Sequence, residues 1–343
     1  MFEREMADVA RAMVAPGKGI LAADESGGTI KKRFDGIGVE STAESRRAYR
    51  EMLFTTPKLG EHVSGVILYD ETLRQSTRDG VPFAELLKKN GILPGIKVDT
   101  GAKNLAGAPG ETVTEGLDGL RERLAEYRKL GAVFAKWRAV ITIGAGIPSR
   151  YCIEANAHAL ARYAALCQEA GIVPIVEPEV LMDGDHTIER CYEVTEDTLV
   201  TVFTELHRQR VDVERAVLKP SMVISGKSCP QQAGVQQVAA ATVRCLKRSV
   251  PGLLPGIVFL SGGQSDELAT AHLNAMNAMG VSLPWPLSFS YGRALQQPAL
   301  KAWKGQAGNV AAAQKALYHR ARMNGAASLG KYRAEMEKEA LAA

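Results

Sequence analysis

The feature that most constrains the fold is a regular alternation of short apolar runs with longer helical patterns. Eight apolar runs, each bounded by glycine, proline or polar residues, occupy residues 19–24, 63–70, 92–99, 132–140, 172–179, 216–223, 256–263 and 283–292. Runs of this kind are typical of buried parallel strands. Segments rich in Ala, Leu, Glu, Lys and Arg between them predict helices at residues 42–53, 117–130, 152–170, 195–209, 236–248 and 267–279. The alternation predicts an α/β protein built as a (β/α)8 TIM barrel.

The length of 343 residues allows either two average domains or one large barrel. A doubly wound sheet with an appended domain is the alternative, but no linker-like change of composition divides the chain. We therefore expect a single domain over residues 1–343. An N-terminal helix within residues 1–16 is expected outside the barrel. Helices at 294–303 and 310–323 should follow the eighth strand, and a helical tail should cover about 330–343.

Composition and charge argue against several classes of protein, among them nucleic-acid binders, membrane proteins and secreted proteins. The 42 Lys and Arg against 38 Asp and Glu give a net charge of +4, too small and too dispersed for a nucleic-acid binder. No window approaches twenty apolar residues, which disfavours a membrane span. The acidic N-terminus resembles neither a secretory signal nor a transit peptide. Five cysteines without CxxC spacing indicate buried thiols of a reducing compartment. These features predict a cytoplasmic protein that binds neither nucleic acid nor membrane.

The predicted carboxyl ends of the strands are unusually polar. They carry Asp24, Asp70, Lys97, Asp99, Lys136, Arg138, Glu177, Glu179, Lys219, Ser261, Ser290 and Arg293. Residues two apart on a strand share one face, so the pairs within one strand point the same way. Any one such charge is more often an ion-pair partner than a catalyst. Because eight strands converge on one rim of a barrel, however, the set as a whole predicts an active site there.

Lys219 is the strongest candidate nucleophile. It lies in the apolar segment Leu218-Lys-Pro220, and burial favours the neutral amine, as would repulsion from Lys136 and Arg138. A neutral amine can attack a ketone to form a Schiff base. Glu177 or Glu179 could supply the acid–base group that removes water. A strand-end lysine that extends to solvent is the alternative for Lys219 taken alone.

Two glycine-containing loops follow the seventh and eighth predicted strands. Gly262, Gly263 and Gly292 supply backbone N–H groups, and a serine hydroxyl and Arg293 stand beside them. Barrels commonly bind phosphate at this place, where helix N-termini meet the loops. The pair of loops therefore predicts a phosphate site.

Nucleotide and metal motifs are missing from the sequence. It contains no HExxH, P-loop or GxGxxG pattern, and the six histidines are scattered. Asp183-Gly-Asp-His186 has metal-binding residue types but lacks a complete ligand set, so a polar turn is favoured. We expect no metal and no cofactor.

Seven segments together resemble class I fructose-bisphosphate aldolases. They are GKGILAADES (17–26), GIKVD (95–99), FAKWR (134–138), IVPIVEPE (172–179), LKPSMV (218–223), FLSGGQS (259–265) and FSYGRAL (289–295). The resemblance extends from about Gly17 to Tyr332. It implies reversible cleavage of fructose 1,6-bisphosphate into dihydroxyacetone phosphate and glyceraldehyde 3-phosphate, in glycolysis and gluconeogenesis. It also implies a metal-independent lyase and a homotetramer that binds a sugar bisphosphate.

The resemblance also implies roles for individual residues. Lys219 matches the Schiff-base lysine, Glu177 the acid–base group, Asp24 the carboxylate at the C4 hydroxyl, and Lys136 and Glu179 the charged groups beside the imine. The C1-phosphate site is matched by Ser261, Gly262, Gly263, Ser290, Gly292 and Arg293. The other phosphate is matched by Ser26, Thr29, Arg33 and Lys97, and Arg138 belongs to the same basic region. Thr29 stands where animal members have serine and keeps the hydroxyl.

The sequence departs from the animal members at its end. Those proteins finish with a tyrosine that assists proton exchange at C3, whereas this sequence ends in Ala342-Ala343, and Tyr332 matches an earlier position. The preference among fructose 1,6-bisphosphate, fructose 1-phosphate and sedoheptulose bisphosphate stays open. Rival interpretations are another lysine-dependent barrel lyase such as a transaldolase-like enzyme, a zinc-dependent aldolase, and a catalytically silent scaffold.

Overall fold

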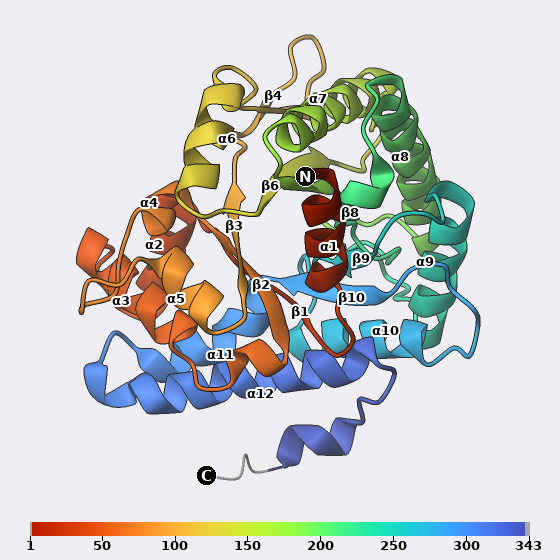
Figure 1. Ribbon diagram of the computed structural model, residues 1–343. Coiled ribbons are helices and arrows are strands. Elements are labelled where there is room, and N and C mark those ends of the chain that lie inside the picture. Colours follow the sequence, from red (N-terminus) through yellow and green to blue (C-terminus); the bar gives the residue numbers. More distant parts are fainter. Residues whose placement is uncertain (1, 340–343) are drawn as a thin grey trace.

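Eight parallel strands close into a barrel in the computed structural model, which describes residues 2–339 (Figure 1). The strands follow one another around the barrel in the order β1-β2-β3-β6-β7-β8-β9-β10, and β10 pairs with β1. Their bounds are β1 (Gly19–Ala23), β2 (Val63–Leu68), β3 (Leu93–Lys97), β6 (Phe134–Ile141), β7 (Val173–Val180), β8 (Val217–Leu218), β9 (Ile257–Phe259) and β10 (Leu287–Tyr291). The predicted (β/α)8 barrel is confirmed.

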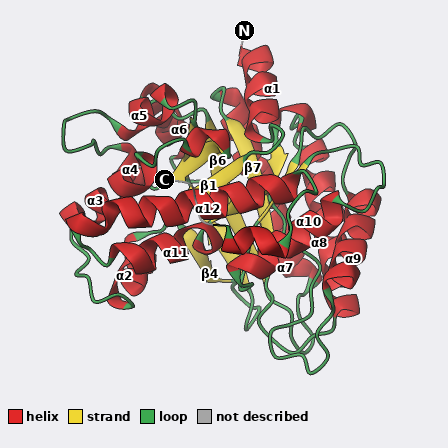
Figure 2. Cartoon of the chain, turned by 90° about the horizontal axis from the view of Figure 1, so that it is seen from below, coloured by secondary structure: helices red, strands yellow, loops and turns green. Residues whose placement is uncertain are grey.

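Helices surround the strands, as Figure 2 shows. The longer ones are α2 (Gly27–Asp35), α3 (Ala43–Phe54), α5 (Phe83–Lys89), α6 (Leu120–Lys129), α7 (Arg150–Glu169), α8 (Ile188–Arg208), α9 (Val235–Ser249), α10 (Asp266–Asn277), α11 (Arg293–Trp303) and α12 (Val310–Ser328). Shorter turns are α4 (Asp70–Leu73), η1 (Leu59–Glu61), η2 (Val213–Arg215) and η3 (Ala307–Asn309). No helix within residues 2–339 is long and apolar enough to cross a membrane.

Side-chain caps explain where several helices begin. Ser149 and Thr187 accept hydrogen bonds from the backbone N–H groups three residues ahead, at the starts of α7 and α8. Ser265 does the same for α10. Each cap satisfies an N–H group that has no partner within its helix. The cap at Thr187 starts α8 before the predicted residue 195.

The N-terminal helix α1 (Phe2–Met13) seals the amino-terminal end of the barrel (Figure 1). Met6, Ala10 and Met13 pack against inward-facing apolar residues such as Ile67 and Phe134. The helix therefore lies outside the ring of strands, as expected, but it completes their inner core. Closure of this end leaves the opposite, carboxyl-terminal end as the open one.

Two features were not predicted correctly. Strands β4 (Gly101–Asn104) and β5 (Thr112–Glu115) form an antiparallel hairpin after β3 that the sequence pattern did not indicate. The expected helical tail is a single 3-10 turn, η4 (Ala334–Lys338), and its residues 340–343 lie outside the described chain. The tail has few apolar residues, so polar contacts position it instead. Glu337 accepts from Tyr332 and Arg320 at 3.0 and 2.5 Å.

Glycines in β2 and β3 make room for an inner-core ring. A Cβ atom at Gly95 would lie 2.2 Å from the Phe134 ring, inside van der Waals contact. We expect Gly95→Ala to lower the free energy of unfolding by about 1–3 kcal/mol, the usual cost of overpacking. Gly28→Ala is the matched control, since nothing lies within 4 Å of its Cβ position in α2. Chemical denaturation should show the control as stable as the parent or slightly more so; equal stability of both variants would contradict this packing.

Candidate active site

A cavity of about 880 Å³ opens at the carboxyl-terminal end of the barrel. Its wall includes these residues predicted from the sequence: Asp24, Ser26, Thr29, Arg33, Lys97, Lys136, Arg138, Glu177, Glu179, Lys219, Ser261, Gly262, Ser290, Gly292 and Arg293. Gly263 alone of the predicted set is not part of the wall, and its N–H points to the Met182 sulfur at 3.0 Å. Asp70, which follows β2, also lines the cavity, so residues from all eight strand ends and the loops after them meet at one place.

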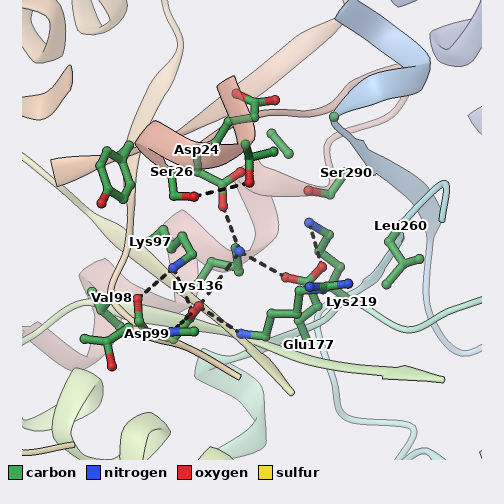
Figure 3. Close-up of a pocket in the computed structure, with 18 of the residues that line it drawn as sticks. Asp24, Ser26, Lys97, Val98, Asp99, Lys136, Glu177, Lys219, Leu260 and Ser290 are labelled. Atoms are coloured by element: carbon green, nitrogen blue, oxygen red, sulfur yellow. Dashed lines mark hydrogen bonds and ion pairs between the residues drawn. The ribbon is translucent and has the colours of Figure 1, made fainter. Parts of the chain in front are cut away.

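The buried Lys136 ammonium occupies the middle of a carboxylate cluster (Figure 3). Its Nζ lies 2.7 Å from Asp24, 3.5 Å from Glu177 and 4.0 Å from Asp99. Burial by itself lowers the pKa of Lys136, but the three carboxylates raise it well above its ordinary value. Burial raises the pKa of Asp24, yet Lys136 and Lys219 hold it well below the usual range. Both groups are therefore charged at neutral pH.

Lys219 follows the short strand β8 and contacts a carboxylate directly. Its Nζ lies 3.1 Å from Oε1 of Glu177, and both side chains are buried. The sequence argument considered burial and neighbouring cations but not this ion pair. The contact provides the acceptor to which Lys219 can transfer its proton and become a neutral nucleophile. The other oxygen of Glu177, Oε2, is buried without a hydrogen-bond partner among the described residues.

Residue spacing on the strands explains how the remaining charges enter the cavity. Lys136 and Arg138 lie two apart on β6, and Glu177 and Glu179 lie two apart on β7, so each pair shares a face. Arg138 forms an ion pair with Glu179 across these neighbouring strands. Burial lowers the pKa of Arg138, but Glu179 raises it above its ordinary value.

Asp99 was noted at a strand end but not predicted as a site residue. Its Oδ1 lies 2.7 Å from Nζ of Lys97, and its Oδ2 accepts from the backbone N–H of Arg138 at 3.2 Å. Gly101 donates its N–H to Oδ1 at 3.1 Å. Asp99 therefore fixes Lys97 at the cavity wall and adds negative charge near Lys136. Its spacing of two from Lys97 was the available sequence signal.

The loops after β9 and β10 form one basic, donor-rich side of the cavity. Gly262 has φ +56°, a left-handed conformation that favours glycine. Arg293, the first residue of α11, donates to the carbonyl groups of Gly262 and Gln264 at 3.3 and 2.7 Å. The buried Ser290 hydroxyl has no hydrogen-bond partner within residues 2–339. An anion bound here would receive donors from a loop, a helix N-terminus and an arginine.

A second basic side lies at the start of α2. Ser26, the N-cap residue, has its hydroxyl 3.2 Å from that of Thr29. Arg33 lies one turn further along α2 and forms an ion pair with the buried Glu25. Lys97 approaches from β3 on the same wall. The cavity thus offers two separate sets of anion-binding groups.

The described residues contain no group of three or more His, Cys, Asp or Glu side chains placed to hold a metal ion. His186, from the segment that has metal-binding residue types, is buried, and neither ring nitrogen has a hydrogen-bond partner in the described chain. Burial lowers the pKa of His186, which keeps the ring neutral. The five cysteines are buried and free.

Removal of the Lys136 charge should be costly. We expect Lys136→Met to lower the free energy of unfolding by about 3–5 kcal/mol at neutral pH, because buried carboxylates lose their partner. Asp24, with its pKa depressed in the fold, contributes stability above its ordinary pKa of about 4 that is lost as the pH falls through the folded value. Without Lys136, Asp24 contributes less stability. The difference in free energy of unfolding between the parent and Lys136→Met should therefore become smaller as the pH falls.

Urea unfolding followed by circular dichroism at neutral pH and at about pH 2.5, below the ordinary pKa of Asp, measures this difference. Arg121→Met is the matched control, since Arg121 pairs with Glu169 at 2.6 Å on the exposed surface. The control should leave stability unchanged at both pH values. A pH-independent deficit for Lys136→Met would contradict the charge cluster.

Comparison with known proteins agrees with this geometry. A family model described as fructose-bisphosphate aldolase class-I matches residues 5–343. A protein of Xanthomonas campestris named "Probable fructose-bisphosphate aldolase class 1" is 66% identical, with 97% of this chain and 100% of the relative covered. The muscle-type fructose-bisphosphate aldolase of Lethenteron camtschaticum is 54% identical, with coverage of 96% and 92%.

A solved structure supports the same assignment. Fructose-bisphosphate aldolase of Plasmodium falciparum, in complex with TRAP and a small-molecule inhibitor, superposes with a TM-score of 0.95. It is 51% identical to this chain, and the match covers 97% of this chain and 96% of that one. The barrel, the lysine–carboxylate cluster and these matches over nearly the full length show that the chain belongs to the class I fructose-bisphosphate aldolase family.

Proposed function

We propose that this chain, acting as one domain over residues 1–343, cleaves fructose 1,6-bisphosphate through a Schiff base on Lys219. The products are dihydroxyacetone phosphate and glyceraldehyde 3-phosphate, and the reaction is reversible. The observation that carries the proposal is the 3.1 Å contact between Lys219 and Glu177, beside Lys136 and between two basic walls. The family membership supports the same reaction.

Imine formation uses Lys219 and Glu177. Lys219 transfers a proton to Glu177, and its neutral amine attacks the C2 ketone of the open-chain sugar. The resulting carbinolamine loses its hydroxyl as water when Glu177 returns the proton. The product is a protonated imine joined to Nζ of Lys219. Burial of both side chains strengthens these electrostatic interactions.

Asp24 is the base for cleavage. Its carboxylate accepts the proton of the C4 hydroxyl, the C3–C4 bond breaks, and the electron pair moves into the protonated imine. The Lys136 contact at 2.7 Å keeps Asp24 ionised, which is the state that a base requires. Lys136 and the Arg138–Glu179 pair complete the charges arranged around the imine.

The two basic walls position the substrate. Ser261, Gly262, Ser290, Gly292 and Arg293 bind the C1 phosphate in this proposal, with Gly263 contributing only through the loop conformation. The other phosphate is bound by Ser26, Thr29, Arg33 and Lys97, and Arg138 adds positive charge. Two anchors fix the C3–C4 bond near Lys219 and reduce the entropic cost of reaching the transition state.

Family resemblance also suggests the setting in which the enzyme works. We infer a homotetramer that acts in the cytoplasm, and a relative from Arabidopsis thaliana, 55% identical, is named as cytosolic. Light scattering coupled to gel filtration tests the oligomeric state. Comparison of fructose 1,6-bisphosphate, fructose 1-phosphate and sedoheptulose bisphosphate tests the substrate preference.

Trapping of the imine is the direct test of the mechanism. Borohydride reduction with dihydroxyacetone phosphate should attach the reduced ligand to Lys219, because hydride converts the imine to a stable secondary amine. Peptide mass spectrometry locates the adduct. Lys219→Ala should give no adduct and no activity while its circular dichroism spectrum stays that of the parent. An adduct on another lysine, or none, would overturn the mechanism.

Arg293 should contribute mainly to substrate binding. Arg293→Ala is expected to raise KM for fructose 1,6-bisphosphate by about tenfold or more, the value of one lost charge-assisted hydrogen bond, with a smaller change in kcat. Steady-state kinetics measures both constants. The exposed Arg121→Ala variant serves as the control, since Arg121 lies outside the cavity wall. An unchanged KM would refute the phosphate role of Arg293.

A further inference from the structure

Glu25 is a buried carboxylate that the proposed reaction does not use. It follows Asp24 directly and lies at the base of the wall that contains Ser26, Thr29 and Arg33. Its exposed fraction is 8%, and a negative charge close to a phosphate site should repel the phosphate. A role that offsets this repulsion is therefore needed to explain a carboxylate in a site for a bisphosphate.

Three side chains from three helices meet at this carboxylate. Oε1 forms an ion pair with Arg33 of α2 and accepts from Nε2 of Gln296, on α11, at 2.8 Å. Oε2 accepts from Nη2 of Arg50, on α3, at 2.6 Å. Burial raises the pKa of Glu25, but Arg33 and Arg50 together lower it below its ordinary value. Glu25 is thus ionised and its two oxygens are both engaged.

The partners of Glu25 are themselves tied to the barrel. Gln296 is fully buried; its Nε2 also donates to the carbonyl of Ala22 in β1 at 2.7 Å. Its Oε1 accepts from the hydroxyl of Tyr49 at 3.1 Å. Arg50, 2% exposed, reaches the same Oε1 at 3.4 Å through its other nitrogen. The planar fork of Arg50 therefore joins Glu25 and Gln296, a geometry that lysine does not reproduce.

We infer that Glu25, Arg50 and Gln296 form a buried positioning network that fixes the Arg33 guanidinium at the cavity wall and so favours substrates carrying a phosphate at both ends. Arg50 and Gln296 are not part of the cavity wall and act through Glu25. Arg50 neutralises Glu25, which leaves the charge of Arg33 available to the substrate. The inference rests on the proposed function, because it assigns Arg33 to the phosphate remote from the imine.

The two possible roles of Glu25, a repelling charge or an anchor for Arg33, predict opposite changes in the binding of the second phosphate when the Glu25 charge is removed. If Glu25 were only a negative charge near the site, or a competitor for Arg33, Glu25→Gln would strengthen binding of the second phosphate. If Glu25 positions Arg33, the same variant weakens it, since the arginine loses its charged anchor. The variant keeps the shape of the side chain, so the sign of the effect decides between the two roles.

The test compares fructose 1,6-bisphosphate with fructose 1-phosphate, which lacks the second phosphate. In Glu25→Gln and Arg50→Lys, kcat/KM for the bisphosphate should fall about tenfold relative to kcat/KM for the monophosphate, the value of one charge-assisted hydrogen bond. Arg50→Lys conserves the charge and removes only the fork. Arg47→Lys is the matched control on the same helix; Arg47 pairs with Glu44 and Glu51 away from the cavity wall. For Arg47→Lys, the ratio of kcat/KM for the bisphosphate to kcat/KM for the monophosphate should equal that of the parent.

Each outcome has a distinct meaning. An equal fall in kcat/KM for both substrates would show that the network only stabilises the fold. A higher ratio of kcat/KM for the bisphosphate to that for the monophosphate in Glu25→Gln would show that Glu25 competes with the phosphate. Either result overturns the inference. If Arg50→Lys does not fold, Glu25→Gln gives the same comparison. Failure of the proposed function would appear in the parent protein, as absence of a trapped adduct on Lys219.

Discussion

The site depends on one ammonium group buried among carboxylates. Lys136 lies within 4.0 Å of Asp24, Glu177 and Asp99, and its positive charge compensates part of the negative charge that these buried or half-buried carboxylates bring together. Its charge keeps Asp24 ionised, the state that the proposed base requires, and Glu177 is shared between Lys136 and Lys219. In the proposed mechanism, the groups for imine formation and those for bond cleavage are thus linked through a single side chain.

The barrel provides this arrangement because its two ends differ. Helix α1 and inward-facing apolar residues fill the amino-terminal end, so the interior there is an apolar core. The carboxyl-terminal end carries the charges, and parallel strands direct all of them to one rim. Strand periodicity then places Lys136 with Arg138, and Glu177 with Glu179, on the cavity face.

Around these groups, ion pairs between side chains fix the orientation of the lysine and arginine side chains on the cavity wall. Lys97 pairs with Asp99, Arg138 with Glu179, and Arg33 with Glu25, so each of these three cations has a carboxylate beside it. Such pairing reduces the net charge but limits the motion of long side chains, which is what precise recognition of a bisphosphate requires. The uncharged donors of the loops after β9 and β10 complete the opposite wall.

Much of this protein could be predicted from local pattern. Eight apolar runs determined the barrel, because strand period and length are written in consecutive residues, and the polar strand ends identified the rim. The hairpin β4–β5 and the 3-10 turn near the C-terminus escaped prediction, since bonds to β6 and α7 support the hairpin and a bond to Arg320 of α12 supports the turn. So did the direction of Gly263 toward Met182 and the bonds among Glu25, Arg50 and Gln296, which are separated by up to 271 residues. The sequence by itself determined which chemical groups reach the rim; only the tertiary structure decided which charge faces which, because ion pairing depends on distances of a few ångströms between separate elements.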